Sequence, residues 1–112
     1  MNMLNSLIIE GEVTRGLVTL PDCKSFEIVT TRYYKKEEEL IEEKSYFTVE
    51  LYGLMAESNV FERNIHVDRG VRVVGRLKQK RWKDEEGKEH SRVVIIAEHI
   101  EFKAHVKKLP TD

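Results

Sequence analysis

The sequence is poor in cysteine and proline, has almost no net charge, and contains no long hydrophobic run. Its single cysteine, Cys23, excludes a disulfide framework and a thiolate metal cluster, so we expect a buried or half-buried thiol in a reducing compartment, the cytoplasm. No apolar run reaches the length of a membrane span, and the N-terminus lacks the charged and apolar regions of a signal peptide. With a net charge of −1 over 112 residues, any basic surface must come from segregated charges.

Enzyme motifs are also missing. The chain has no Walker A loop and no G-x-G-x-x-G after a predicted strand. Its histidines are scattered, without the H-E-x-x-H spacing or the carboxylate cluster of a zinc site, and are expected at the surface or at strand ends. They are His66, His90, His99 and His105. We therefore expect no catalytic residue, no metal and no cofactor.

The most informative stretch is Gly70–Trp82, G-V-R-V-V-G-R-L-K-Q-K-R-W. Alternate residues of a strand point to opposite faces, so this strand has one apolar side and one side that is mostly cationic and ends in an indole. A row of cations with an aromatic side chain suits a flexible polyanion whose bases can stack. An ordinary solvated strand face is the alternative.

Two further strands precede it. The first is expected over Leu4–Leu20, with bends or bulges at Gly11 and Gly16, and Pro21-Asp22 predicts the turn that closes it. The second is expected over Lys24–Tyr34, where β-branched and aromatic residues dominate.

The next segment, Lys35–Lys44, reads K-K-E-E-E-L-I-E-E-K and is interpreted as a long, mobile hairpin loop between β-rich segments. Ser45–Gly53 then alternates cleanly. Phe47, Val49 and Leu51 are predicted to face the core, and Tyr46, Thr48, Glu50 and Tyr52 to face outward. Two outward tyrosines with polar neighbours suggest a stacking platform, although packing between strands or a subunit contact would also use them.

One helix is predicted, over Leu54–Val67, from an apolar stripe at helical spacing. A polar hairpin with Gly87 near its tip should connect the cationic strand to a last strand over Ser91–Phe102. That last strand is apolar on both faces. One face should meet the core, and the other is a candidate subunit interface.

The resulting order is three strands, a helix and two strands. This is the order of the OB-fold, a five-stranded Greek-key barrel with a helix between its third and fourth strands, which commonly binds oligonucleotides or oligosaccharides. We assign residues 1–103 to one such domain and residues 104–112 to a short polar C-terminal extension.

Several segments resemble the bacterial-type single-stranded DNA-binding protein, and the likeness covers nearly the whole chain. They are N-S-L-I-I-E-G-E-V-T-R (5–15), F-E-I-V-T-T-R-Y-Y (26–34), Y-F-T-V-E-L-Y-G-L-M-A-E (46–57), V-G-R-L-K-Q-K-R-W (74–82) and V-V-I-I-A-E-H-I-E-F (93–102). The resemblance implies an OB-fold homotetramer that wraps single-stranded DNA and stacks its bases on aromatic side chains. It implies a role in DNA replication, recombination and repair.

The resemblance and the strand alternation together indicate the binding residues. The candidates are the aromatics Tyr34, Tyr46, Tyr52 and Trp82 and the cations Arg32, Lys35, Arg72, Arg76, Lys78, Lys80 and Arg81. Tyrosine replaces the family's tryptophan at several positions, which should keep stacking but weaken it.

Three features depart from the family. The first hairpin, between Arg15 and Phe26, is shorter, and the segment between Gly53 and Gly70 is longer by about one turn. The family's flexible C-terminal region, whose acidic-hydrophobic tip recruits replication and repair enzymes, is missing, so we expect a truncated or naturally tailless member that recruits no partner in this way.

Two other functions remain open from the sequence. One is a tailless OB-fold accessory, such as a primosome-type interaction protein that acts chiefly as a dimer. The other is an RNA-binding or anticodon-binding OB module of a larger enzyme.

Overall fold

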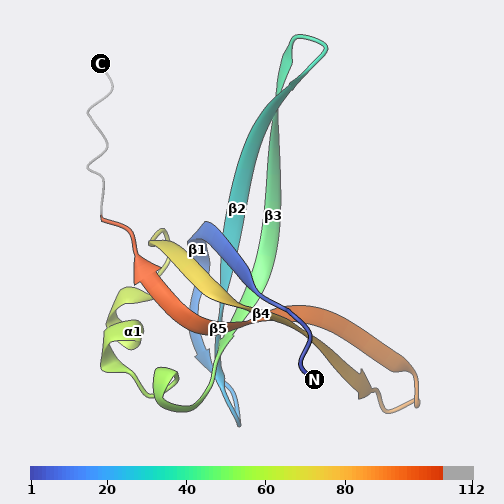
Figure 1. Cartoon of the computed structure of the whole chain (residues 1–112). Helices are drawn as coiled ribbons and strands as arrows, with labels where there is room; N and C mark the ends of the chain where they lie inside the picture. The colour runs from blue at the N-terminus through green and yellow to red at the C-terminus, as the bar shows by residue number, and fades with distance from the viewer. Residues whose placement is uncertain (105–112) are drawn as a thin grey trace.

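Five strands and two short helical segments make up residues 7–102 of the computed structural model, which describes residues 1–104. They are β1 (Leu7–Thr19), β2 (Lys24–Lys36), β3 (Glu39–Leu51), η1 (Gly53–Met55), α1 (Asn59–Asn64), β4 (Gly70–Lys83) and β5 (Glu89–Phe102). The strands close a barrel in the order β1-β2-β3-β5-β4, with α1 between β3 and β4 (Figure 1). The OB-fold prediction is confirmed. Most of the predicted extension, including His105, lies outside the described residues.

Strand β1 closes the barrel because it pairs with two neighbours. Its first half is antiparallel to β4, from Leu7 opposite Gly75 to Glu12 opposite Gly70, and its second half is antiparallel to β2. The register with β2 shifts twice between Val13 and Val18, around the predicted bend at Gly16. β1 is slightly shorter at both ends than predicted.

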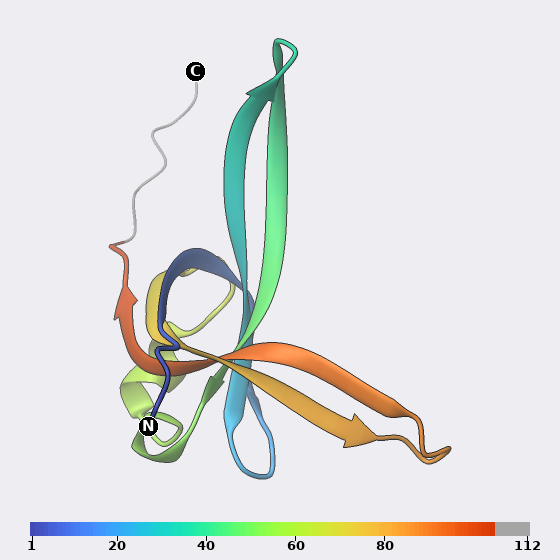
Figure 2. The same ribbon diagram turned by 45° about the vertical axis from the view of Figure 1, so that its right-hand side comes forward.

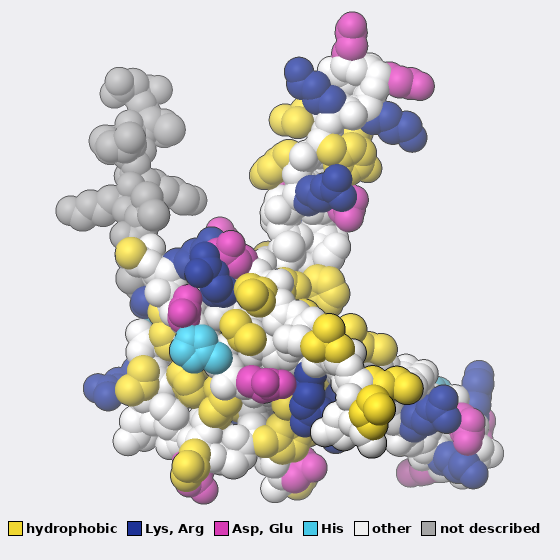
Figure 3. Space-filling view, in the orientation of Figure 1, with side chains coloured by type: hydrophobic (Ala, Val, Ile, Leu, Met, Phe, Trp, Pro, Cys, Tyr) yellow, Lys and Arg dark blue, Asp and Glu magenta, His cyan; other side chains and the backbone are white. Residues whose placement is uncertain are grey.

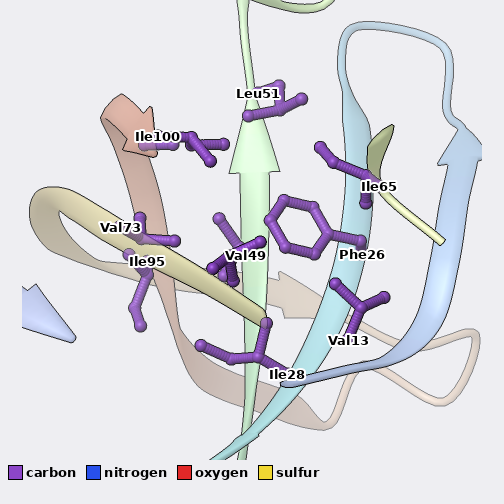
Figure 4. Packing of buried hydrophobic residues seen from close by; sticks show 11 residues of the cluster. Val13, Phe26, Ile28, Val49, Leu51, Ile65, Val73, Ile95 and Ile100 are labelled. Atoms are coloured by element: carbon purple, nitrogen blue, oxygen red, sulfur yellow. The ribbon is translucent and has the colours of Figure 1, made fainter. Parts of the chain in front are cut away.

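The core fills the barrel with side chains from every strand (Figure 4). Phe26, Ile28, Val49 and Leu51 are fully buried there, as the alternation predicted for β2 and β3. Phe47, predicted to be a core residue, lies beyond the barrel and is partly exposed. Ile65, from the connection between β3 and β4, also enters the core (Figure 4).

Two hairpins extend well beyond the barrel as separate arms, the β2–β3 arm and the β4–β5 arm (Figures 1 and 2). Their directions diverge because β3 and β5 pair only briefly, in parallel, with Val49 opposite Ile95 and Glu50 opposite Ile96. Past these residues each hairpin is a two-stranded ribbon with side chains on both faces.

The prediction that Lys35–Lys44 forms a long, mobile loop is wrong. Both strands continue through it, and β2 and β3 stay paired without a register shift until Lys36 faces Glu39. Opposite charges face each other across the ribbon, as in the pair Arg32 and Glu43, and such pairs stabilise a hairpin. Glu37 and Glu38 form the turn, with φ values of 52° and 71°. A two-residue hairpin turn of type I′ requires positive φ at both positions, which Asn and Gly usually supply, so two glutamates gave no turn signal.

The helix predicted over Leu54–Val67 is also wrong in extent. Ser58 has an extended backbone and interrupts it, and the Ser58 hydroxyl then caps α1 by accepting a hydrogen bond from the Phe61 N–H. Ile65 leaves the helical conformation with φ −87° and ψ 89° and turns into the core. Core packing therefore ends α1 after six residues. No helix within residues 1–104 is long and apolar enough to cross a membrane.

The second apolar face of β5, which was predicted to be a candidate subunit interface, is covered largely by the chain itself. Val94 and Ile96 occupy this face, opposite the core residues Ile95 and Ala97, and both are buried within the single chain. A partner subunit is therefore not needed to cover them. Val93 remains exposed on the β4–β5 arm.

Candidate nucleic-acid interface

The outward faces of β3 and β4 meet at the base of the two arms. The Lys80 ammonium lies 2.5 Å from a Glu50 carboxylate oxygen, and the Lys78 ammonium lies 5.9 Å from the centre of the Tyr52 ring. These contacts span β5, which separates β3 from β4 in the barrel. The structure therefore brings Lys78, Lys80 and Tyr52 together, as the alternation of both strands predicted.

Glu50 lies on the predicted outer side of β3 but is fully buried, with 0% exposure. The Tyr52 hydroxyl donates a hydrogen bond of 2.8 Å to the same carboxylate. Burial and this hydrogen bond raise the pKa of Tyr52, and Cys23, which is buried beside it, also has a raised pKa because of burial. Tyr52 is thus held by its hydroxyl at the base of the two arms.

The β2–β3 arm has two faces, and the candidate tyrosines lie on different ones. Tyr46 shares its face with Lys44, Tyr33 and Lys35, because the unbroken register pairs even positions of β3 with odd positions of β2. Tyr33 is 59% exposed. Tyr34, the sequence candidate, lies on the opposite face.

On that opposite face, the Arg32 guanidinium lies 5.7 Å from the centre of the Tyr34 ring, a cation–π distance. The structure therefore does not bring Tyr34 and Arg32 together with Tyr46. The candidate Lys35 lies on the same face of the arm as Tyr46, nearer the turn.

Tyr33 and Lys44 were missed by sequence reasoning. The missing signal was the register of the hairpin. A two-residue turn at Glu37-Glu38 fixes the register of β2 against β3, so Val29 faces Tyr46. Tyr33 lies an even number of residues from Val29 along β2, so its side chain is on the same face as Tyr46. The interpretation of Lys35–Lys44 as a loop removed this constraint.

Trp82 lies near the tip of the β4–β5 arm. Its indole stacks on the His90 ring at a centroid distance of 5.6 Å and an angle of 19°. His90 Nε2 in turn lies 2.7 Å from Asp84 Oδ2. The hydrogen bond from His90, together with backbone N–H groups of the tip, lowers the pKa of Asp84. Arg81 lines a hollow beside Trp82 and His90.

Arg72, also a sequence candidate, lies at the other end of β4. Its guanidinium is 3.6 Å from Glu10 and 3.4 Å from Glu101, and Lys103 also contacts Glu10. The structure therefore places Arg72 in an ion-pair cluster across β1, β4 and β5, apart from Trp82. Arg76 lies between the two regions, 3.9 Å from Glu98.

Cationic side chains are interspersed with acidic ones over both arms and the barrel (Figure 3). Segregation of charge is therefore local, along single strand faces. Among residues 1–104 no group of three or more His, Cys, Asp or Glu side chains could hold a metal ion.

Comparison with protein families identifies the family to which this fold belongs. The model of the single-strand binding protein family matches residues 4–103. The chain belongs to this family. Because the family consists of DNA-binding proteins without enzymatic activity, the chain is not an enzyme.

Individual family members agree. The single-stranded DNA-binding protein of Aquifex aeolicus is 38% identical over 104 residues, which cover 88% of this chain and 69% of that protein. The Helicobacter pylori protein of the same name is 30% identical over 106 residues, covering 89% of this chain but only 58% of its own length.

Solved structures share the fold at low sequence identity. The Plasmodium falciparum SSB in complex with ssDNA superposes with a TM-score of 0.78 at 17% identity, over 93% of this chain and 98% of that one. The small single-stranded DNA-binding protein of Streptomyces coelicolor gives a TM-score of 0.69 at 23% identity, over 92% and 96%.

The raised pKa of Tyr52 predicts a late step in alkaline titration. Its contribution to folding is complete below the ordinary tyrosine pKa of about 10 and is lost as the pH rises above it. We expect the tyrosinate absorbance of Tyr52 at 295 nm to develop only above this range, and Tyr52→Phe to abolish that late step. Tyr46→Phe, which removes an exposed phenol of the β2–β3 arm, should retain it. A late step that survives in Tyr52→Phe would contradict the assignment.

Proposed function

We propose that the chain binds single-stranded DNA without sequence preference, neutralising phosphates with lysine and arginine and stacking bases on exposed aromatic rings. The observation that carries the proposal is that aromatic rings and cations share outward strand faces. On the β2–β3 arm Tyr33 and Tyr46 share a face with Lys35 and Lys44, Tyr52 lies beside Lys78 at the base of the arm, and Trp82 is on the same face of β4 as Lys78 and Lys80. Membership of the single-strand binding protein family supports it. The biological role follows as protection of exposed single strands in the cytoplasm, at the nucleoid, during replication, recombination and repair.

Stacking explains how such a surface selects single strands. Every base has a π-face, so a ring accepts any base with about 1–3 kcal/mol of stabilisation, and duplex DNA hides those faces. The cations add affinity through release of counterions, which is independent of sequence. The two arms diverge from the barrel, so a strand of DNA can follow one arm to the base and continue along the other (Figure 2).

The principal experiment is a titration of the Trp82 fluorescence with a dT oligomer, a duplex and a matched RNA at two salt concentrations. We expect tight binding of the dT oligomer, much weaker binding of the duplex, and a log–log salt slope of about −0.7 per neutralised phosphate. A clear preference for RNA would favour an RNA-binding OB module instead. Absence of saturable binding would refute the proposal.

The arm faces predict a difference between neighbouring tyrosines. Tyr33→Ala removes a ring from the face that carries Tyr46 and should weaken dT binding by about fivefold to 150-fold, the equivalent of one stacked base. Tyr34→Ala removes a ring from the opposite face and is the matched control, with a smaller effect expected. The reverse order of the two effects would place the DNA on the Arg32 side of the arm.

We infer that the chain acts as a homotetramer. Leu4 is almost fully exposed in the single chain, at 94%, and the outward Ile8 of β1 is 70% exposed, and a small barrel gains burial by association. Sedimentation equilibrium should give the mass of four chains. A dimer would contradict this inference and would favour an accessory OB-fold protein that acts through protein contacts.

A further inference from the structure

Glu50 is a fully buried carboxylate in the middle of the proposed DNA-binding surface. It faces Ser25 of β2 and Ile96 of β5 across the sheet, and both of these are buried. An ionised carboxylate removed from water is strongly destabilising unless it is paired and hydrogen-bonded. The groups that pair with Glu50 therefore explain in part why the fold tolerates a buried carboxylate at this position.

Both partners of Glu50 belong to the proposed binding surface. One carboxylate oxygen is 2.5 Å from the Lys80 ammonium, and the other accepts the 2.8 Å hydrogen bond from Tyr52. The side chain of Lys80 is only 29% exposed, because it lies inward toward Glu50. The positive charge of Lys80 is thus already neutralised inside the protein, whereas Lys78 extends over the Tyr52 ring.

We propose that Glu50 is a positioning residue of the proposed binding surface, which withdraws Lys80 from phosphate binding and fixes Tyr52 by its hydroxyl, leaving Lys78 as the phosphate contact at this point. The inference rests on the proposed binding of single-stranded DNA. It assigns opposite roles to two cations that alternate on the same strand face and that are indistinguishable in the sequence. Glu50 therefore lowers the contribution of phosphate neutralisation to the binding free energy at this point. Base stacking on Tyr52 then supplies a larger part of that free energy.

The decisive measurement is the salt dependence of dT binding, because a purely structural ion pair would leave it unchanged. Glu50→Gln keeps an acceptor for Tyr52 but releases Lys80, so the log–log slope should become steeper by about 0.7, the value for one more phosphate. The matched control is Glu62→Gln, which removes one exposed carboxylate from α1 and should leave the slope as in the wild type.

Two further variants keep the test decisive if Glu50→Gln does not fold. Glu50→Gln combined with Lys80→Met removes both charges, and a buried pair replaced by neutral groups is often tolerated. This double variant should have the wild-type slope, whereas Lys78→Met alone should flatten it by about 0.7. A double variant with a slope flattened by this amount would show that Lys80 contacts phosphate and would overturn the inference.

The outcomes separate this inference from the proposed function. If the wild-type chain does not bind the dT oligomer, the proposed function fails, and with it the premise of the role assigned to Glu50. If the wild type binds and Glu50→Gln folds with an unchanged slope, only the role of Glu50 is refuted. Near-ultraviolet circular dichroism, which reports the packing of Tyr52 and Trp82, verifies the fold of each variant.

Discussion

The short parallel contact between β3 and β5 is the constraint on which the rest of this structure depends. It closes the barrel at Val49 and Glu50, and it is too brief to hold the two hairpins together beyond that point. The β2–β3 and β4–β5 arms therefore separate (Figure 1), and the register of each arm sets its own rows of side chains. The core side of the contact is apolar, at Val49 and Ile95, while its outer side carries the buried carboxylate of Glu50. Two neighbouring residues of β3, Val49 and Glu50, thus both close the barrel and organise the proposed binding surface.

Charge is distributed in pairs over this protein, consistent with its net charge of −1. Arg72 lies between two glutamates, Lys80 contacts Glu50, and Lys44 contacts Glu42. A count of cations on a strand face therefore overstates the charge offered to a phosphate chain. Exposed ion pairs of this kind contribute little to stability and are readily exchanged, whereas the buried pair at Glu50 is not. The structure shows which candidate cations are paired with an acidic side chain and which extend into solvent. Alternation along a strand does not give this information.

Much of the fold followed from local patterns. Alternation predicted the core positions of β2, β3 and β4 inside the barrel, with Phe47 on the arm as an exception, and the order of elements predicted the barrel with its intervening helix. The failures have a common cause. The β2–β3 arm and the connection that contains α1 have compositions compatible with several local structures, and contacts distant in sequence select one of them. Cross-strand pairing extends the arm to Glu37-Glu38, and burial of Ile65 ends α1 early.

The candidate site divides in the same way. Tyr52, Lys78 and Lys80 lie together because the direction of a side chain follows from parity along a single strand, although Lys80 is paired with the buried Glu50. Tyr33, which was not among the candidates, shares a face with Tyr46, and the candidate Tyr34 does not, because parity between two strands depends on the turn that joins them.

By itself, the sequence determined the barrel, the faces of its individual strands and the resemblance to single-stranded DNA-binding proteins, since these depend on periodicity and on short motifs. Only the tertiary structure decided the register of the β2–β3 arm, the burial of Glu50 and the partner of each cation. These depend on which side chains meet across strands that are distant in the chain, and the alternation within one strand contains no information about that meeting.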